Sequence, residues 1–259
     1  MRKFIFTLAT LAAAALPLAS QAQSDTLRFG VDPTFRPYEY RLADGSLAGF
    51  DVDLGNEICK RLNAKCMWVQ QPFDSIIPAL KAKKFDAILS GMTATPKRRE
   101  QLDFTDRLFA GIGALVAKCG TELHATPESL RGKRIGVGLG SSQEAYAKTH
   151  WAPKGVELVP YPNMEGVRAD LVAGRIDVSF ESAAPAQIGF LDQPQGKGFC
   201  MVGEKITDKD LVGDGTAIGL EKGNDALRTR INEAIAAIRK DGTYMTIAKK
   251  YFDYDPYGE

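Results

Sequence analysis

Short apolar stretches of strand character alternate with amphipathic stretches of helical character along this chain, and this order limits the possible folds more than any other feature. In one stretch Leu54, Ile58 and Leu62 recur every fourth residue, which indicates one face of a helix. A β-α-β-α-β order predicts a parallel sheet flanked by helices. The first five segments are, strand first, residues 27–31, 51–62, 66–69, 74–80 and 85–89.

The same order begins again in the middle of the chain. Strands over 134–137, 157–161 and 176–180 alternate with helices over 142–148 and 165–172. Two such units predict an α/β fold of two lobes, each a mostly parallel sheet flanked by helices, with short crossovers around a cleft. One continuous doubly wound sheet is the alternative that the pattern leaves open.

Short polar residues stand at the expected helix starts. Asp51 precedes the Leu54 stripe, Asp74 precedes the second helix, and Asn224 precedes a C-terminal helix with Ile231 and Ile235 on one face. Aspartate and asparagine are preferred N-caps, because their side-chain oxygens accept hydrogen bonds from the first free backbone N–H groups. We therefore expect all three residues to cap the helices that follow them.

The first 22 residues have the composition of a signal peptide. Arg2 and Lys3 give a basic start, residues 4–18 are apolar, and residues 20–22, Ser-Gln-Ala, form a small-x-small cleavage site. An N-terminal membrane anchor is the alternative, but the apolar run of ~15 residues is shorter than the ~20 that span a bilayer. We expect export with cleavage after Ala22.

Composition excludes some classes of partner. The formal net charge is +1, and two basic residues belong to the predicted leader, so the exported chain is close to neutral. No run of lysine and arginine suggests a basic patch, so nucleic acid is not an expected partner. The remainder of the 259 residues is long enough for two lobes.

Four cysteines are expected to meet an oxidising compartment after export. Cys59 and Cys66 are seven residues apart, across the end of a helix and the next strand. This spacing is neither a CxxC redox pair nor a zinc pattern, and both histidines stand alone, so we predict a structural disulfide and no metal site. Cys119 and Cys200 remain. An even count favours a second bridge, and two buried thiols are the alternative.

Polar residues gather after the predicted strands, where ligands bind in open α/β sheets. Arg98, with Thr93 nearby, can hold a carboxylate in a bidentate fork. A solvated surface arginine is the alternative, as we assume for Lys97 and Arg99. Residues 138–143, Gly-Leu-Gly-Ser-Ser-Gln, form a glycine turn that opens a helix, and its backbone N–H groups suit an anion of carboxylate size.

An acid and two aromatic rings lie in other predicted loops. Asp32 and Phe35 follow the first strand, and Phe73 precedes the second helix. The rings can stack on a flat or aliphatic chain whose cationic end pairs with the carboxylate. Rings buried in the core are the alternative. No serine or cysteine stands near a histidine in the sequence and no GxSxG is present, so we predict no catalytic residue and no cofactor.

Several longer motifs resemble one known family. The segments GFDVDL, EICKRLNAKC, IPALKAKKFDAILSGM, TPKRR, HWAPKG, AGRID and DGTY…AKKYF cover the chain beyond the leader from end to end. They resemble the periplasmic polar-amino-acid-binding proteins of ABC importers, solute-binding protein family 3, most of all the histidine- and lysine/arginine/ornithine-binding members. The resemblance implies a monomeric binding protein of type II fold that delivers its ligand to a membrane permease.

The resemblance also implies lobe boundaries and site roles. Lobe 1 would comprise residues 23–110 and 214–259, with lobe 2 at 111–213. Arg98, Thr93 and Ser142 would hold a carboxylate and Asp32 a cationic side chain between the two phenylalanines, with Cys59–Cys66 as the family disulfide. The expected ligand-binding residues are Asp32, Phe35, Phe73, Ser90, Gly91, Thr93, Arg98, Ser141, Ser142 and Ser182.

Two departures from the family pattern affect the expected ligand. Gly91 replaces a serine, which many members tolerate, and Ser182 replaces the aspartate that holds the ligand's α-ammonium group. The leading hypothesis is capture of a cationic amino acid or a derivative, and the alternative is an opine or guanidino acid without a free α-amino group. From another class, a cyclohexadienyl or arogenate dehydratase on the same fold would need a general acid, for which Glu181 is the one candidate. A sensor would need a transmembrane segment and signalling domain.

Overall fold

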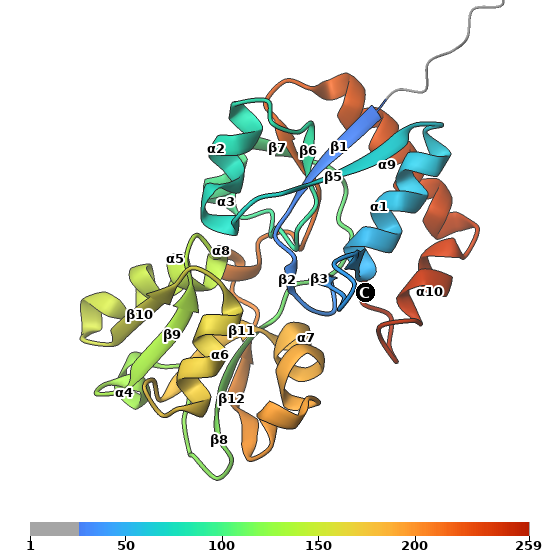
Figure 1. Ribbon diagram of the computed structural model, residues 1–259. Helices are drawn as coiled ribbons and strands as arrows, with labels where there is room; N and C mark the ends of the chain where they lie inside the picture. Colours follow the sequence, from blue (N-terminus) through green and yellow to red (C-terminus); the bar gives the residue numbers. More distant parts are fainter. Residues whose placement is uncertain (1–25, 259) are drawn as a thin grey trace, which may run out of the picture.

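The computed structural model describes residues 26–258 and shows two lobes, each built on its own five-stranded sheet (Figure 1). The alternative of one continuous sheet is therefore wrong, and the predicted two-lobed α/β fold is confirmed. The predicted leader lies outside the described residues. We call the part around the first sheet lobe 1 and the part around the second sheet lobe 2.

The sheet of lobe 1 has the strand order β5-β1-β6-β13-β7. Strands β1, β5 and β6 are parallel, and β13 runs antiparallel to both of its neighbours. Four strands therefore share one direction, and the reversed strand comes from the C-terminal part of the chain. The strands are β1 (Thr26–Val31), β5 (Lys65–Gln70), β6 (Ala87–Ile88), β7 (Leu102–Phe104) and β13 (Gly219–Glu221).

The sheet of lobe 2 has the order β10-β9-β11-β8-β12. Here β10, β9 and β11 are parallel, and β8 runs antiparallel to β11 and β12. The two sheets thus repeat one plan, with a single reversed strand in fourth place. The strands are β8 (Gly113–Lys118), β9 (Arg134–Gly138), β10 (Glu157–Tyr161), β11 (Val178–Ser182) and β12 (Phe199–Ile206).

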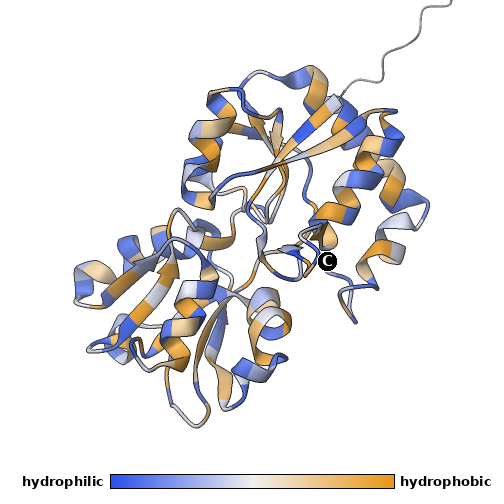
Figure 2. Ribbon diagram, viewed as in Figure 1, coloured by the Kyte–Doolittle hydropathy of each residue, from blue (hydrophilic) through white to orange (hydrophobic). Residues whose placement is uncertain are grey.

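Helices cover both sheets, and Figure 2 shows hydrophobic residues on the strands and in stripes along the helices. Lobe 1 also carries a small sheet of β2 (Thr34–Phe35), β3 (Glu39–Arg41) and β4 (Leu47–Ala48). Its helices are α1 (Phe50–Arg61), α2 (Ile76–Lys81), α3 (Pro96–Arg99), α9 (Asp225–Lys240) and α10 (Thr243–Ala248). Those of lobe 2 are α4 (Pro127–Leu130), α5 (Ser142–His150), α6 (Met164–Val172), α7 (Ala183–Ala186) and α8 (Lys209–Val212). The 3₁₀ turns are Phe73–Ser75, Ala152–Lys154 and Pro194–Gly196, and a π-helical turn spans Gln187–Leu191.

Two extended crossovers join the lobes, after β7 and after β12. They run side by side: the Leu108 amide donates to the Thr216 carbonyl at 2.7 Å, and the Thr216 amide donates to the Phe109 carbonyl at 2.9 Å. Tyr38 stacks on Phe109 with ring centroids 4.3 Å apart, which ties the crossover to the core of lobe 1. A pair of hydrogen-bonded segments at one edge of a cleft is the arrangement of a hinge.

Two of the three predicted helix caps are wrong. Helix α1 begins at Phe50 after Gly49, and the Asp51 carboxylate, inside the first turn, accepts from the Gly91 amide at 2.9 Å instead of capping. A 3₁₀ turn precedes α2, so Ser75 and not Asp74 stands before that helix. Asn224 caps α9 as predicted, since its side chain accepts from the Leu227 amide.

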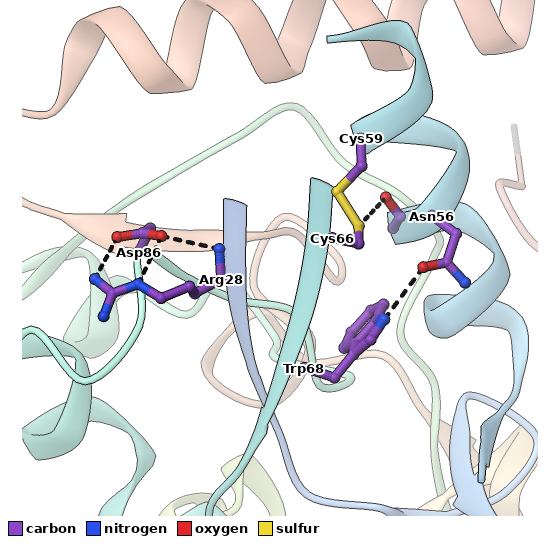
Figure 3. Close-up of a disulfide and its surroundings, with 7 residues drawn as sticks. Arg28, Asn56, Cys59, Cys66, Trp68 and Asp86 are labelled. Carbon is purple, nitrogen blue, oxygen red and sulfur yellow. Dashed lines mark hydrogen bonds and ion pairs between the residues drawn. A yellow bond between two sulfur atoms is a disulfide. The ribbon is translucent and has the colours of Figure 1, made fainter. Parts of the chain in front are cut away.

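The structure contains two disulfides. Cys59–Cys66 joins the end of α1 to β5 with an S–S distance of 1.96 Å, as Figure 3 shows. In the same region the Trp68 indole donates to the Asn56 side chain at 3.2 Å. The disulfide and this hydrogen bond both hold α1 against the sheet. Cys119–Cys200 joins the far ends of β8 and β12 at 2.01 Å, which removes the alternative of two thiols there.

Within residues 26–258, no helix combines the length and the hydropathy that crossing a membrane requires.

Candidate functional site

A cavity of about 600 Å³, part of it open to solvent, lies between the lobes. It is lined by loops that follow β1, β6, β9, β10 and β11, so both sheets point their carboxyl ends at it. The structure brings every residue of the predicted site to this one cavity. These residues are Asp32, Phe35, Phe73, Ser90, Gly91, Thr93, Arg98, Ser141, Ser142 and Ser182.

Arg98 is a buried cation at one side of the cavity, with 8 % of its surface exposed. Thr95 caps the short helix α3 that carries it, and its guanidinium donates to the Thr93 carbonyl at 3.0 Å and the Gly140 carbonyl at 2.8 Å. Burial lowers the pKa of Arg98 to about 10. No carboxylate within residues 26–258 pairs with it, and two of its five N–H groups have partners, so it can still bind an anion.

Helix α5 points its N-terminus at the same side. The Ser141 hydroxyl accepts from the Glu144 amide at 3.0 Å, and the Glu144 carboxylate accepts from the Gly140 amide at 2.8 Å. This reciprocal cap fixes the glycine turn. The first helical amides, those of Ser142 and Gln143, have no intrahelical acceptor at such a helix start, and Ser142 is buried against the cavity.

Asp32 is the ionisable counterpart of Arg98 in the cavity lining, with 8 % exposure. Its carboxylate accepts from the Thr34 hydroxyl at 2.9 Å and the Phe73 amide at 3.0 Å. Burial raises the pKa of Asp32, the two hydrogen bonds oppose that shift, and the charges of Asp74 and Glu165 add to it. No cationic side chain of the described chain pairs with it. A ligand cation would relieve this buried charge.

The two predicted aromatic residues also line the cavity, both half-buried. The Phe73 ring lies 5.3 Å from the Arg98 guanidinium, and its amide is held by Asp32. Phe35 lies against Gly91, where a Cβ atom would come within 2.9 Å of the ring. Gly91, at φ +54°, thus makes room for the Phe35 ring at the cavity wall.

A hydrogen-bonded chain of buried polar groups lies below this wall. The Asp32 amide donates to the Ser90 hydroxyl at 3.0 Å, which donates to Glu39 Oε1 at 3.0 Å. The Gly91 amide donates to Asp51 Oδ2 at 2.9 Å. Ser90 therefore reaches the cavity with its hydroxyl already engaged by the protein.

On the lobe 2 side, Ser182 ends β11 and accepts from the Gln143 side chain at 3.0 Å. Its neighbour Glu181 has no exposed side-chain surface, forms an ion pair with Arg168 at 2.5 Å, and accepts from the Ser179 hydroxyl at 2.9 Å. Pairing between β11 and β8 is regular from Ser179 to Ser182, so consecutive side chains point to opposite faces. The Glu181 side chain therefore points to the face opposite to that of Ser182, although Glu181 is also among the residues that line the cavity.

The lobes touch across the cavity. Besides the bond from Arg98 to Gly140, a Cβ atom on Gly140 would lie 3.0 Å from Asp74 Cα, and one on Gly189 would lie 2.6 Å from the Arg36 carbonyl oxygen. Each contact joins backbone of one lobe to the other. The two lobes are therefore in contact over the cleft, with a glycine at each of these two backbone contacts.

Besides residues that adjoin the predicted ones in sequence, the lining includes four residues from segments that the sequence did not single out: Glu39, Pro162, Asn163 and Met164. The last three follow β10, and the strand-end rule applied to that strand would have found them. Glu39 carries no signal in the sequence, because its position depends on the small sheet. Away from the cavity, His150, Asp208 and Asp210 place ligand atoms within 4.8 Å of one another, the one grouping among the described residues that could hold a metal ion. His150, which stands alone in the sequence, thus lies beside two aspartates in the structure.

Comparisons with known proteins agree with this geometry. The model of the bacterial extracellular solute-binding proteins, family 3, matches residues 27–254. The histidine-binding periplasmic protein of Escherichia coli K12 is 45% identical over 259 residues and covers 100% of both chains. The lysine/arginine/ornithine-binding periplasmic protein of the same strain is 45% identical over 260 residues, again over 100% of both chains. The solved structure of an ancestral arginine-binding protein bound to arginine has a TM-score of 0.81 at 36% identity, over 88% of this chain and 98% of that one.

Proposed function

The chain belongs to the bacterial extracellular solute-binding proteins, family 3, and from this premise we propose that it captures a cationic amino acid or a derivative in the periplasm and delivers it to the permease of an ABC importer. Relatives named for histidine and for lysine, arginine and ornithine match it over the whole chain, which supports this class of ligand. Catalysis is not part of the proposal.

One observation supports the proposed class of ligand more than any other. The cavity has a buried cation, Arg98, and a buried anion, Asp32, and neither forms an ion pair with any side chain of residues 26–258. A ligand with a carboxylate at one end and a cation at the other would compensate both charges. The aromatic rings of Phe35 and Phe73 offer faces for the chain between its two ends.

The test begins with protein purified from cells without denaturation. Mass spectrometry of the released small molecules should find a basic amino acid or a derivative, and calorimetry should give tight binding for arginine, lysine, ornithine or histidine. Glutamate serves as the matched control, because it carries the carboxylate and lacks the cationic end. Glutamate binding more tightly than every basic compound would reject the proposed class.

A second candidate ligand is an opine or a guanidino acid without a free α-amino group. Ser182 stands where the resemblance implies an aspartate for the α-ammonium group, and Glu181 does not replace it because Arg168 and Ser179 hold its carboxylate. A charged hydrogen bond contributes about 1.5–3 kcal/mol, more than a neutral hydroxyl offers. Free arginine should therefore bind about ten- to a hundredfold more weakly than it binds to Ser182→Asp.

A thermal-shift screen of wild type and Ser182→Asp separates the two ligand candidates. Basic amino acids should gain from the aspartate, 4-guanidinobutyrate, which has no α-nitrogen, should not, and octopine, whose α-nitrogen is alkylated, should gain less than arginine. Nanomolar binding of free arginine or lysine by wild type, with no gain in Ser182→Asp, restores the ordinary amino acid as the ligand.

The enzyme of the same fold remains the runner-up from another class. A dehydratase needs a general acid for the departing hydroxyl, and Glu181 would have to supply it from an ion pair with Arg168, with no exposed side-chain surface. We expect no aromatic product from prephenate or arogenate incubated with the purified protein. Product that disappears in Glu181→Gln would establish catalysis.

The remaining parts of the proposal concern maturation and assembly. We propose export with cleavage after Ala22, a monomer without nucleic-acid partners, and lobe boundaries at 23–110 with 214–259 and at 111–213. The crossovers after β7 and β12 support these boundaries. N-terminal sequencing of the periplasmic protein and its mass in solution by light scattering check the first two points.

A further inference from the structure

Two carboxyl groups lie against each other beneath the cavity. Glu39 is 1 % exposed and Asp51 0 %, and within residues 26–258 neither forms an ion pair with a basic side chain. They bind consecutive residues, since Glu39 accepts from the Ser90 hydroxyl and Asp51 from the Gly91 amide, and the charge of Asp51 raises the pKa of Glu39. Two interacting like charges cannot both persist in a buried site without a cation beside them. The pair therefore holds at least one proton.

The other contacts decide which oxygen carries it. Glu39 Oε1 accepts from the Ser90 hydroxyl and Asp51 Oδ2 accepts from the Gly91 amide. The remaining oxygens, Glu39 Oε2 and Asp51 Oδ1, are buried and have no hydrogen-bond partner among the described residues. A single proton on Glu39 Oε2, donated to Asp51 Oδ1, satisfies both at once.

The electrostatic surroundings agree with this placement. Burial and the charge of Asp51 raise the pKa of Glu39 well above its usual value, while burial raises the pKa of Asp51 to about 6. These shifts favour the proton on Glu39 and the charge on Asp51. The other titratable groups that face the pair are Asp32, across Ser90, and the phenols of Tyr38 and Tyr244, which are themselves buried.

This protonation has a consequence for Ser90. Its single hydroxyl proton goes to Glu39, and one of its two lone pairs accepts from the Asp32 amide. What remains toward the cavity is one lone pair, beside the acceptor-only carboxylate of Asp32. That end of the cavity can accept hydrogen bonds and cannot donate them.

We propose that Glu39, as a neutral carboxyl bonded to Asp51, is a positioning residue that fixes the direction of the Ser90 hydroxyl and so makes the Asp32 end of the cavity specific for N–H donors. The inference rests on the proposed function of the cavity and deepens it. The direction of the Ser90 hydroxyl would then contribute to selectivity in addition to the charge of Asp32. A ligand end that presents a carbonyl oxygen finds no hydrogen-bond donor there.

The test compares L-arginine with L-citrulline, in which a urea carbonyl replaces one NH₂ group of the guanidinium. Calorimetry at pH 7 gives the preference for arginine over citrulline in each variant. Glu39→Gln should keep the wild-type preference within about threefold, because the carboxamide accepts from Ser90 and donates to Asp51 as the protonated acid does. Glu39→Met, of similar length, frees the hydroxyl to donate, and should lower the preference about tenfold, the effect of one hydrogen bond.

Ser90→Ala provides the matched background. If Glu39 acts through the Ser90 hydroxyl, adding Glu39→Met to Ser90→Ala should change the preference by less than about twofold. A tenfold effect in both backgrounds would overturn the inference, because Glu39 would then act directly. A tenfold loss of preference in Glu39→Gln would also overturn it, because an ionised Glu39 would be required.

A measurement without ligand separates this inference from the proposed function. In protein carrying ¹³C-labelled glutamate, the Glu39 carboxyl signal, identified by its loss in Glu39→Gln, should be that of a protonated acid at pH 7. An ionised signal overturns the inference. Failure of wild type to bind any basic compound rejects the proposed function instead, and the state of Glu39 is still decided by its signal.

Discussion

At the scale of single residues, the cavity is defined by two buried charges that the protein itself leaves uncompensated. Among residues 26–258, Arg98 has carbonyl partners and no carboxylate, and Asp32 has neutral donors and no cation. Removing one member of a buried charge pair costs more than removing a surface charge, because the other member is left unpaired. Substitution of either residue should therefore weaken binding strongly. Substitution of Arg98 should affect recognition of the ligand's carboxylate, and substitution of Asp32 recognition of its cationic end.

Arg98→Ala should abolish the main carboxylate contact. Truncation of a buried hydrogen-bonded charge costs about 2–5 kcal/mol, which corresponds to a loss of affinity of about thirtyfold or more. Calorimetry with the best-binding basic compound measures it. Lys97→Ala, an exposed lysine on the same helix, is the control and should bind as wild type does. Near-native affinity in Arg98→Ala would remove this residue from the site.

Asp32→Asn tests selection of the cationic end. The asparagine can accept from the Phe73 amide and donate to Thr34, so the loop should hold while the charge is lost. Binding of arginine should weaken about tenfold or more, the worth of about 1.4 kcal/mol, and binding of glutamine should not. Equal loss for both ligands would mean that Asp32 only supports the loop.

The protonation of Asp32 adds a pH dependence of the same sign. Because the pKa of Asp32 is raised, its carboxylate is fully ionised only above that value. Affinity for a cation should be complete at higher pH and should be lost as pH falls through the raised pKa. Calorimetry across the acidic range on wild type and Asp32→Asn checks this, and a parallel decline in both would assign the effect to other groups.

At the scale of elements, apolar periodicity placed the strands and helices that it predicted to within about two residues, but the short strands and helices between them were not predicted. The predicted strand over 157–161 is β10 itself, and the predicted α5 and α6 differ from the observed helices only near their ends. The caps were less predictable. Asp51 is the residue type that caps helices, but a tertiary contact with Gly91 takes its carboxylate.

The residues of the candidate site were likewise predictable only in part. Residues at strand ends were predictable, since sheet topology alone collects them in one place. Glu39 was not, because its role depends on Asp51 and Ser90, which are distant in sequence and meet only in the folded lobe. Likewise nothing in the sequence shows that Arg168 occupies the Glu181 carboxylate. Partners that bury a charge are fixed by packing, not by local pattern.

The disulfide between β8 and β12 is testable as an element of lobe 2. Cys119 and Cys200 are 81 residues apart in sequence and lie at the end of the sheet opposite to Ser182. Replacing both by serine should lower the free energy of unfolding by about 2–5 kcal/mol while leaving ligand affinity unchanged. Chemical denaturation and calorimetry measure the two effects. Peptide mapping without reductant is the control, and free thiols at both positions in wild type would contradict the bond.

At the scale of the whole molecule, Gly140 lies at a contact between the lobes and should control their closure. Gly140→Ala places a methyl group 3.0 Å from Asp74 Cα, so the closed form is hindered and affinity should fall. Gly132→Ala is the matched control: its φ of +76° resembles the +71° of Gly140, and no atom lies within 4 Å of the added methyl.

Both alanine variants should lose about 1–2 kcal/mol of stability from the left-handed backbone. Only Gly140→Ala should lose affinity, by about tenfold if closure is hindered by 1.4 kcal/mol. Thermal melts on the two variants measure the loss of stability, and calorimetry measures the loss of affinity. Equal affinities would mean that the Gly140 contact is not part of the closed state that binds ligand.

The bond from the Arg98 guanidinium to the Gly140 carbonyl has a consequence for timing. Arg98, which is proposed to hold the ligand's carboxylate, thus also joins the two lobes. The ligand therefore cannot leave while this hydrogen bond between the lobes is intact. Its residence time in the cleft is then set by how often the hinge opens, not by how quickly individual contacts break. A permease that pulls the lobes apart would shorten that time directly, and unloading would need no competitor for the cavity.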